Sequence, residues 1–380
     1  MNNSNLNWLM PNTVFVTLHG SQAYGLANEQ SDVDVKGICV PPREVENNLF
    51  QRFDQAENHP SIEEDLGHLK NPKNPKFESV IYSLRKFMVL AANINPNIME
   101  LLWTGPSDWF VSKKYPMEKL MANRHLFLSS KAKFAFGGYA YSQLAKIERH
   151  RKWIVLGDLT EPKREDFGLP VERARQLDEV FGFIKSEVER WNLSKFPMEE
   201  LDRADLKETI WELVKNVSGL SVGWDNWPQA YEAAVVNRIA EEYDLKEEVV
   251  ALLHREREYK KAREQYSSWV NWKKNRNPAR AVLEEKSGYD TKHASHLVRL
   301  MRMGYEILTE GKVLVKRPDR EEILLVKNGG WSYEQVMEFA KDMQSRLDDA
   351  YKITKLPKTV DYEAINALYH ELNEEYHSER

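Results

Sequence analysis

The stretch from residue 14 to residue 40 limits the possible folds more than any other part of this chain. Apolar and polar residues alternate over residues 12–19 and again over residues 32–40. Alternation with a period of two predicts two β-strands and places Asp32 and Asp34 on one face of the second. Two such carboxylates repel each other unless a cation lies between them. A magnesium ion, held by oxygen ligands and completed by phosphate groups, would meet that need.

The dipeptide Gly20-Ser21 ends the first predicted strand. Glycine lets the backbone approach a phosphate group closely, and serine adds a short hydroxyl. A Gly-Ser or an Asp-x-Asp alone usually marks a turn or a solvated strand face. The combination is more specific: a strand, Gly-Ser, about ten residues, and then Asp-x-Asp within a strand. It resembles the signature of the polymerase-β-type nucleotidyltransferase superfamily.

Composition restricts the class of protein. The chain has 380 residues, 42% of them hydrophobic and 30% charged, which is typical of a globular protein with two or more domains. A net charge of −5 excludes a uniformly basic nucleic-acid binder but leaves room for a local basic groove. The single cysteine, Cys39, excludes an internal disulfide and favours the cytoplasm. The sequence has neither a long apolar run nor a signal-peptide pattern, so we expect no membrane association.

Three further stretches give local predictions. We expect a short strand over residues 78–82, followed by a helix that Ser83 caps and whose apolar residues recur at helical spacing. Residues 43–76 are predicted to be irregular, a hairpin or flexible insertion at the rim of the site, because Asn and Pro cluster over residues 71–75. Residues 312–330 are predicted to form a hairpin-like pair of strands.

A third carboxylate is expected near the Asp-x-Asp pair, because two-metal phosphoryl chemistry generally uses one to share a metal. Glu78 is the best-placed acid, since it opens the next predicted strand. A solvated strand end explains Glu78 equally well. Glu63, Glu64 and Asp65 are weaker candidates for the same role.

Two basic stretches also carry aromatic residues, residues 131–152 and residues 255–280. Positive charge for the backbone and rings for the bases are what a groove for single-stranded nucleic acid needs. Most charged stretches are solvated helix faces, and that interpretation stays open here. The candidate nucleic-acid contacts are Lys146, Arg149, Arg276, Arg280 and His293.

A second distinctive segment begins near residue 288. Asp290 is predicted to cap a helix on which Lys292, His296 and Arg299 form one cationic stripe. Such a stripe near a helix N-terminus suits a triphosphate or a nucleic-acid phosphate. A cationic face in water is the alternative. His293 and His296 are three residues apart, but no third ligand is near in sequence, so a metal pair there is disfavoured.

Together the two ends of the chain resemble the nucleotidyltransferases predicted to act in RNA repair, a polymerase-β-like family whose genes accompany RNA ligases. The resemblance rests on HGSQAYGLANEQSDVDVKGICVPP and on residues 82–103, 136–147, 276–301 and 311–331. It implies Mg²⁺ or Mn²⁺ at Asp32, Asp34 and Glu78, with a nucleoside triphosphate (NTP) such as ATP beside Gly20 and Ser21. Glu78 departs from the family pattern, in which an aspartate is expected.

The resemblance also implies an α+β protein with a polymerase-β-type core: a small mixed sheet with flanking helices, followed by a large, mainly helical C-terminal region. We expect a catalytic domain over residues 1–112 and a substrate-binding region over residues 113–380, with a helical insertion at residues 160–255. Acidic helices are predicted within that insertion over residues 172–191, 198–217 and 231–245.

The expected activity is transfer of a nucleoside monophosphate to an RNA end, either tRNA or cleaved RNA, with an RNA ligase as a partner. Two alternatives stay open: a protein or small-molecule acceptor, and a non-catalytic RNA-binding partner of a ligase.

Overall fold

The structure, a computed structural model, describes residues 6–50, 52–171 and 247–378. Its contacts divide the chain into two compact units. One comprises residues 1–154 and 279–380, and the other comprises residues 155–278. The domain boundary expected at residue 112 and the insertion expected at residues 160–255 stay predictions. The helices expected over residues 172–245 lie outside the described residues.

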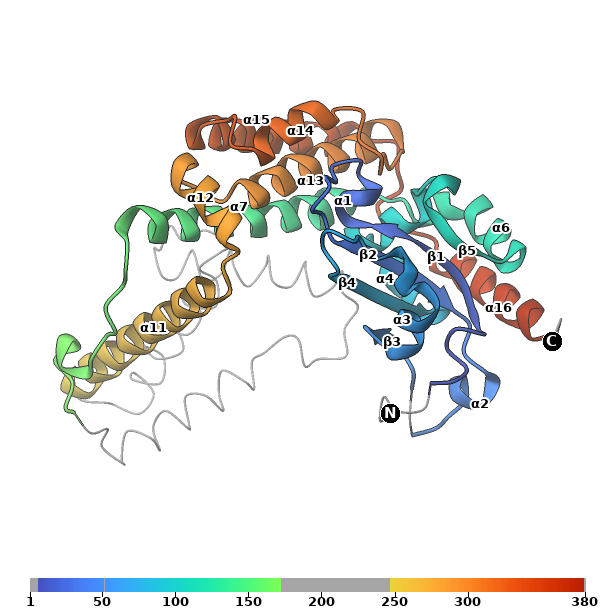
Figure 1. Cartoon of the computed structure of the whole chain (residues 1–380), viewed down its shortest axis with the longest axis horizontal. Helices are drawn as coiled ribbons and strands as arrows, with labels where there is room; N and C mark the ends of the chain where they lie inside the picture. The colour runs from blue at the N-terminus through green and yellow to red at the C-terminus, as the bar shows by residue number, and fades with distance from the viewer. Residues whose placement is uncertain (1–5, 51, 172–246, 379–380) are drawn as a thin grey trace. The chain divides into compact units, whose positions relative to one another are not determined.

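The first unit contains a five-stranded mixed sheet with the strand order β3-β4-β2-β1-β5 (Figure 1). Strand β1 is antiparallel to β2 and β5, β2 is parallel to β4, and β3 is antiparallel to β4. The strands are β1 (Thr13–His19), β2 (Val33–Cys39), β3 (Gln55–Glu57), β4 (Phe77–Ser83) and β5 (Trp109–Ser112). The strands predicted over residues 12–19, 32–40 and 78–82 are thereby confirmed as β1, β2 and β4.

One face of the sheet is sealed by the short helix α3 (Pro60–Leu66). Its apolar residues Ile62 and Leu66 pack with Val33, Val35 and Ile81 in one buried cluster. Because side chains alternate along β2, this apolar packing directs Asp34 and Lys36 to the opposite face. The hydrophobic pattern of the strand therefore decides which face carries the acids.

The opposite face is covered further along β2 by α4 (Leu84–Ala92). Ile38 of β2 shares a second buried cluster with Phe87 of α4 and with the C-terminal helices. The Ser83 hydroxyl accepts a hydrogen bond from the Lys86 N–H at 3.2 Å, which confirms the predicted N-cap. Because α4 covers only the later part of β2, the polar residues at the start of the strand can make other contacts.

The rest of the first unit is mainly helical, as expected. The central helix α13 (Thr291–Glu310) packs against α14 (Arg320–Lys327) and α15 (Tyr333–Ile353), as Figure 1 shows. The other longer helices are α6 (Lys114–Ala122), α7 (Ala132–Leu156), α12 (Pro278–Ser287) and α16 (Tyr362–Ser378). This combination of a small mixed sheet, flanking helices and a helical C-terminal region is the predicted α+β fold.

Two local predictions are wrong. Residues 43–76 are not irregular throughout, because they contain α2 (Arg43–Glu46), β3 and α3. Helix α3 forms because Pro60 opens its first turn and its apolar residues, four apart, reach the sheet.

The predicted hairpin at residues 312–330 is wrong as well, because α14 occupies most of its second arm. Ile323 and Val326, three residues apart, are fully buried against the core. Their β-branched side chains favour a strand in isolation, but packing against α13 overrides that preference.

The second unit contains the long helix α11 (Glu247–Asn275) and a turn of 3-10 helix, η5 (Arg164–Phe167). Arg164 of η5 forms an ion pair with Glu256 of α11, and both side chains are largely buried. Among the residues that the structure describes, no helix is both long enough and apolar enough to cross a membrane.

The N-cap of α4 gives a first prediction. Ser83→Ala removes the hydroxyl that accepts from Lys86 N–H and should lower the free energy of unfolding by about 1 kcal/mol. Chemical denaturation followed by circular dichroism measures this change. Ser112→Ala on the exposed side of β5 is the control and should leave stability unchanged. Equal stability of the two variants would contradict the assigned cap.

Candidate active site

Three carboxylates meet where β2 and β4 run side by side. Asp34 of β2 and Glu78 of β4 are direct partners in the parallel register, and Asp32 lies two residues before Asp34. The charges of Asp32 and Glu78 both act on Asp34. The side chain of Asp32 is 34% exposed and that of Glu78 is 52% exposed. The acids predicted from sequence are therefore assembled by neighbouring strands of one sheet.

The repulsion within this cluster affects the pKa of Asp34. Burial, and then repulsion from Asp32 and Glu78, raises its pKa from 3.8 to about 6. Its Oδ1 atom is buried and has no hydrogen-bond partner among the described residues. A buried carboxylate oxygen without a donor is unfavourable unless a cation or proton satisfies it. These features fit the residues to a divalent cation with hard oxygen ligands.

Gly20 has a steric role beside Asp34. The chain turns sharply after β1, and Gly20 has a φ of +63°, which side-chain-bearing residues rarely adopt. A Cβ at this position would lie only 2.3 Å from Asp34 Oδ2. Ser21 follows in the first turn of the short helix α1 (Gly20–Ala23). The glycine therefore makes room for the carboxylate as well as for any phosphate.

Lys76 reaches into the acid cluster from the residue before β4. Its Nζ contacts Glu78 Oε1 and lies 3.6 Å from Asp32 Oδ2. The hydrogen bond to Glu78 is the main reason that the pKa of Lys76 is raised. The acids thus already attract a positive charge, that of Lys76. This lysine is 59% exposed and can turn outward. Sequence reasoning missed Lys76, although it lies two residues before Glu78 on the same strand face.

Two lysines from the C-terminal helices face the same acids. The exposed Lys292 on α13 acts on the charge of Asp34. Lys327 on α14 is half-buried, and its Nζ donates to the Leu26 carbonyl at 3.0 Å. Burial, and then repulsion from Lys292, lowers the pKa of Lys327, against the opposing attraction of Asp32. Sequence reasoning missed Lys327 because it expected a hairpin there.

The comparisons with known proteins agree with this geometry. A protein-family model described as the RNA repair pathway DNA polymerase beta family matches residues 4–154. The match covers 151 of the 380 residues. An uncharacterized 38.9 kDa protein in the nrdC-mobD intergenic region of Enterobacteria phage T4 is 30% identical over 138 residues. The similarity covers 35% of this chain and 38% of the phage protein. No solved structure matches the chain significantly.

The family segment holds all three acids and Gly20-Ser21, whereas Lys292 and Lys327 lie beyond it. The C-terminal helices are nevertheless tied to the turn that follows α1. Arg317 N–H donates to the Tyr24 carbonyl at 3.2 Å, and the Arg320 side chain donates to the Gly25 carbonyl. These contacts fix α14 beside the polymerase-β-like core, which brings its lysine to the acids.

Arg299 lies beneath the site instead of lining it. Its side chain is 2% exposed, contacts Glu100 and lies 3.7 Å above the ring of Tyr24. Tyr24 Oη donates to the second Glu100 oxygen at 2.5 Å. Helical spacing correctly put Arg299 on a face with Lys292, but that face passes from solvent into the core. The arginine predicted to bind a nucleotide thus has its partners within the protein.

Glu100 links this buried arginine to the strands. His19 Nε2 lies 3.2 Å from Glu100 Oε2 and 3.3 Å from Lys36 Nζ, and Lys36 is two residues after Asp34. Burial opposes ionisation of Glu100, but Arg299 and His19 outweigh it and hold its pKa well below the usual range. Glu100 was missed in the sequence because it lies within an apolar segment. Its signal was that isolation: a single acid among buried residues needs a partner.

The predicted histidines are neutral in this environment. Burial, and then the charge of Arg299, lowers the pKa of His296 well below its ordinary value. Burial also lowers the pKa of His293 to about 4, although Asp290 opposes the shift. His296 therefore does not supply the positive charge that the cationic stripe implied. Lys292 is the member of the stripe that combines charge with exposure.

The candidate nucleic-acid contacts are distributed over both compact units. Lys146 is half-buried and Arg149 is exposed on α7, whereas Arg280 forms an ion pair with Asp290 at 2.7 Å. His293 is hydrogen-bonded to Gln143. Arg276 belongs to the second unit, where its guanidinium lies over Trp272. The nucleic-acid role of all five residues stays a prediction.

Asp34 gives a prediction about stability. Between pH 4 and pH 6 the folded protein binds a proton at Asp34 that the unfolded chain releases, so its stability falls as pH rises through this window. Asp34→Asn should remove that penalty and raise the free energy of unfolding at pH 7.5 by about 1 kcal/mol, after allowance for solvent screening. Near pH 4 the two proteins should be equally stable.

Thermal unfolding without divalent metal, at both pH values, measures this difference. The exposed Asp65→Asn is the control and should show no gain. A loss of stability in Asp34→Asn at pH 7.5 would show that the carboxylate is not strained.

Proposed function

We propose that this protein is a divalent-metal-dependent nucleotidyltransferase that moves a nucleoside monophosphate from an NTP to an RNA end. One observation carries the proposal. In a polymerase-β-like segment, the charges of Asp32 and Glu78 act on Asp34, whose Oδ1 has no donor among the described residues and whose Oδ2 lies directly beside Gly20. Such a cluster destabilises the free protein and is explained by a cationic ligand.

Asp32, Asp34 and Glu78 are the residues that would hold Mg²⁺ or Mn²⁺. When bound, the metal supplies positive charge that stabilises the phosphates and lowers the pKa of an acceptor hydroxyl. Lys76 turns outward when the acids are occupied, because its ion pairs with Asp32 and Glu78 are exposed and weak. The glutamate at position 78 reaches one methylene further than the aspartate of the family pattern.

The remaining residues orient the donor and receive the proton. The turn at Gly20-Ser21 places backbone N–H groups and a hydroxyl near the phosphates, and Lys292 and Lys327 neutralise their charge. A carboxylate of the cluster accepts the proton of the acceptor hydroxyl. The acceptor oxygen then bonds to the α-phosphorus while the bond to pyrophosphate breaks.

The acceptor is proposed from the family description, which names an RNA repair pathway. Lys146 and Arg149 on α7 supply basic groups for an RNA backbone, and an RNA ligase is the natural partner that would use the modified end. The single cysteine, Cys39, is buried, which suits a reducing cytoplasm.

The direct test is transfer of label from each α-labelled NTP to RNA. With Mg²⁺ and a pool of tRNA and cleaved RNA, we expect label in RNA. Asp32→Asn and Asp34→Asn should each lower the rate roughly hundredfold or more, because each weakens several kcal/mol of metal-dependent stabilisation. Asp65→Asn is the matched control. Label on protein would replace RNA with a protein acceptor, and full activity in both site variants would refute the proposal.

Lys327, which sequence reasoning missed, gives a separate prediction. Lys327→Ala should raise the KM for the NTP roughly tenfold, because one charged contact to phosphate is lost. Lys312→Ala changes a 64% exposed lysine paired with Glu310 and should leave KM unchanged. Steady-state kinetics with varied NTP concentration measures the KM of both variants, and thermal unfolding verifies that both variants fold. An unchanged KM in Lys327→Ala would exclude the lysine from the donor site.

A further inference from the structure

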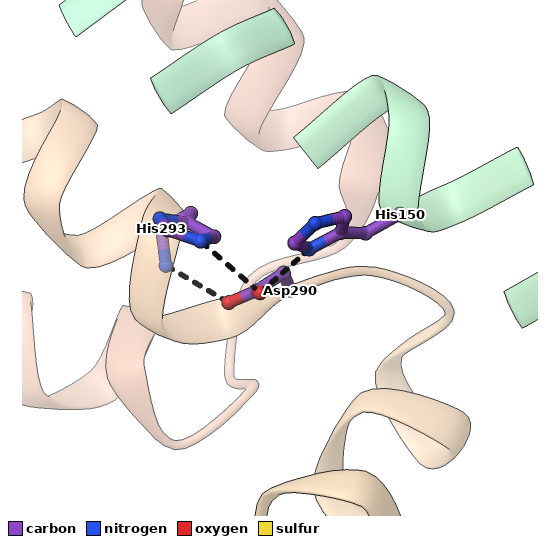
Figure 2. A group of neighbouring side chains, drawn as sticks. All are labelled: His150, Asp290 and His293. Carbon is purple, nitrogen blue, oxygen red and sulfur yellow. Dashed lines mark hydrogen bonds and ion pairs between the residues drawn. The ribbon is translucent and has the colours of Figure 1, made fainter. Parts of the chain in front are cut away.

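A second cluster of ligand-type side chains lies away from the three acids. Figure 2 shows His150 from α7, Asp290 at the N-cap of α13 and His293 from the first turn of α13 pointing toward one another. One ligand atom from each residue lies within 4.8 Å of the other two. His150 lies 140 residues before Asp290 in the sequence, and all three residues lie in the first compact unit.

The two oxygens of Asp290 have different partners. Oδ1 accepts from the backbone N–H of His293 at 3.0 Å and from Arg280 Nη2 at 2.7 Å. These contacts cap α13 and hold the carboxylate in place. Oδ2 instead faces the two imidazoles, 3.0 Å from His150 Nδ1 and 3.5 Å from His293 Nε2 (Figure 2). One oxygen thus anchors the side chain while the other points at two ring nitrogens.

A hydrogen bond on the far side of His293 orients its ring. His293 Nδ1 lies 2.7 Å from Gln143 Oε1, and Gln143 Nε2 donates to Ser142 Oγ at 3.3 Å. The amide therefore presents its oxygen to the ring, so Nδ1 carries the proton. The Nε2 lone pair of the neutral ring then faces the carboxylate oxygen of Asp290. Metal-bound histidines show the same arrangement, with the other ring nitrogen hydrogen-bonded to an acceptor.

We propose that His150, Asp290 and His293 bind one transition-metal ion of the Zn²⁺ class. Two imidazole nitrogens and one carboxylate oxygen are a ligand set typical of zinc, with a fourth position left for solvent or another ligand. Mg²⁺ prefers oxygen ligands and is assigned to the acids of the active site. The chain therefore has two metal sites of different chemistry.

Charges of both signs lie around the cluster. Asp290 and the 2% exposed Glu284 are negative, whereas Arg280 and Lys146 are positive. Arg280 lies 3.3 Å from Glu284 and uses the other oxygen of Asp290, so it leaves Oδ2 available. The two imidazole nitrogens among the ligands favour zinc over magnesium.

The site would connect the active site to α7. Lys292 lies between Asp290 and His293 on the first turn of α13, and its charge acts on Asp34. His150 and Trp153 both lie on α7, and their rings are stacked with centroids 5.4 Å apart. This stacking orients the His150 ring. An ion bound by all three residues would fix the turn that carries Lys292.

The test is zinc binding by the full chain after removal of metal with a chelator. We expect one Zn²⁺ per chain by calorimetry and elemental analysis, a higher unfolding temperature with zinc, and no displacement by excess Mg²⁺. His293→Gln and Asp290→Asn should each weaken binding at least roughly tenfold. Asn can still cap α13, so Asp290→Asn separates metal binding from folding. His68→Gln, at an exposed histidine, is the control.

Circular dichroism without zinc must show wild-type helix content for a variant to count. Zinc affinity lost in both site variants but kept in His68→Gln would support the site. Absence of stoichiometric zinc in the wild type, or wild-type affinity in both site variants, would overturn it.

Discussion

The repulsion among three carboxylates is the constraint on which the rest of the site depends. Packing of Val33 and Val35 against α3 directs Asp34 to the opposite face, where the parallel register with β4 brings Glu78 beside it. The sheet is therefore stabilised by the same alternation that assembles the acids. Burial raises the pKa of Asp34 and makes the free site unfavourable, which is a common feature of sites that bind a charged ligand.

Three lysines from different parts of the chain offset this repulsion. Lys76 comes from the strand that carries Glu78, whereas Lys292 and Lys327 come from helices far along the chain. Beneath them, the buried pair of Arg299 and Glu100 joins α13 to His19 at the end of β1. Removing one partner of such a pair leaves an uncompensated buried charge. The helical C-terminal region therefore supplies charges that act on the acids as well as covering the sheet.

The sequence predicted the parts that depend on local periodicity. Alternation identified the strands with Asp32 and Asp34, and Glu78 was correctly placed at the start of the next strand. Helical spacing also put Lys292 and Arg299 on one face. Spacing alone does not reveal where that face enters the core, so the burial of Arg299 could not be predicted. Local preference likewise misassigned α14, because packing against α13 outweighs the strand preference of its residues.

Long-range contacts were beyond the reach of the sequence. A metal pair at His293 and His296 was disfavoured because no third ligand is near in sequence, but the structure turns His293 toward Asp290 and toward His150, which comes from a distant helix. Lys327 reaches the site through tertiary packing, and nothing in its own segment signals it. Gly20 was expected to allow the close approach of a phosphate. The structure adds a second reason for glycine at this position, because a Cβ there would lie 2.3 Å from Asp34 Oδ2.

The most direct test of the central claim is to locate the metal. Crystals of the protein with Mn²⁺ and a non-hydrolysable NTP analogue allow anomalous scattering to identify the ion. We expect manganese bound by Asp32, Asp34 and Glu78, the phosphates beside Gly20-Ser21, and Lys76 turned away from the acids. Manganese absent from this cluster, with Lys76 still in contact with Glu78 in the presence of the nucleotide, would contradict the account.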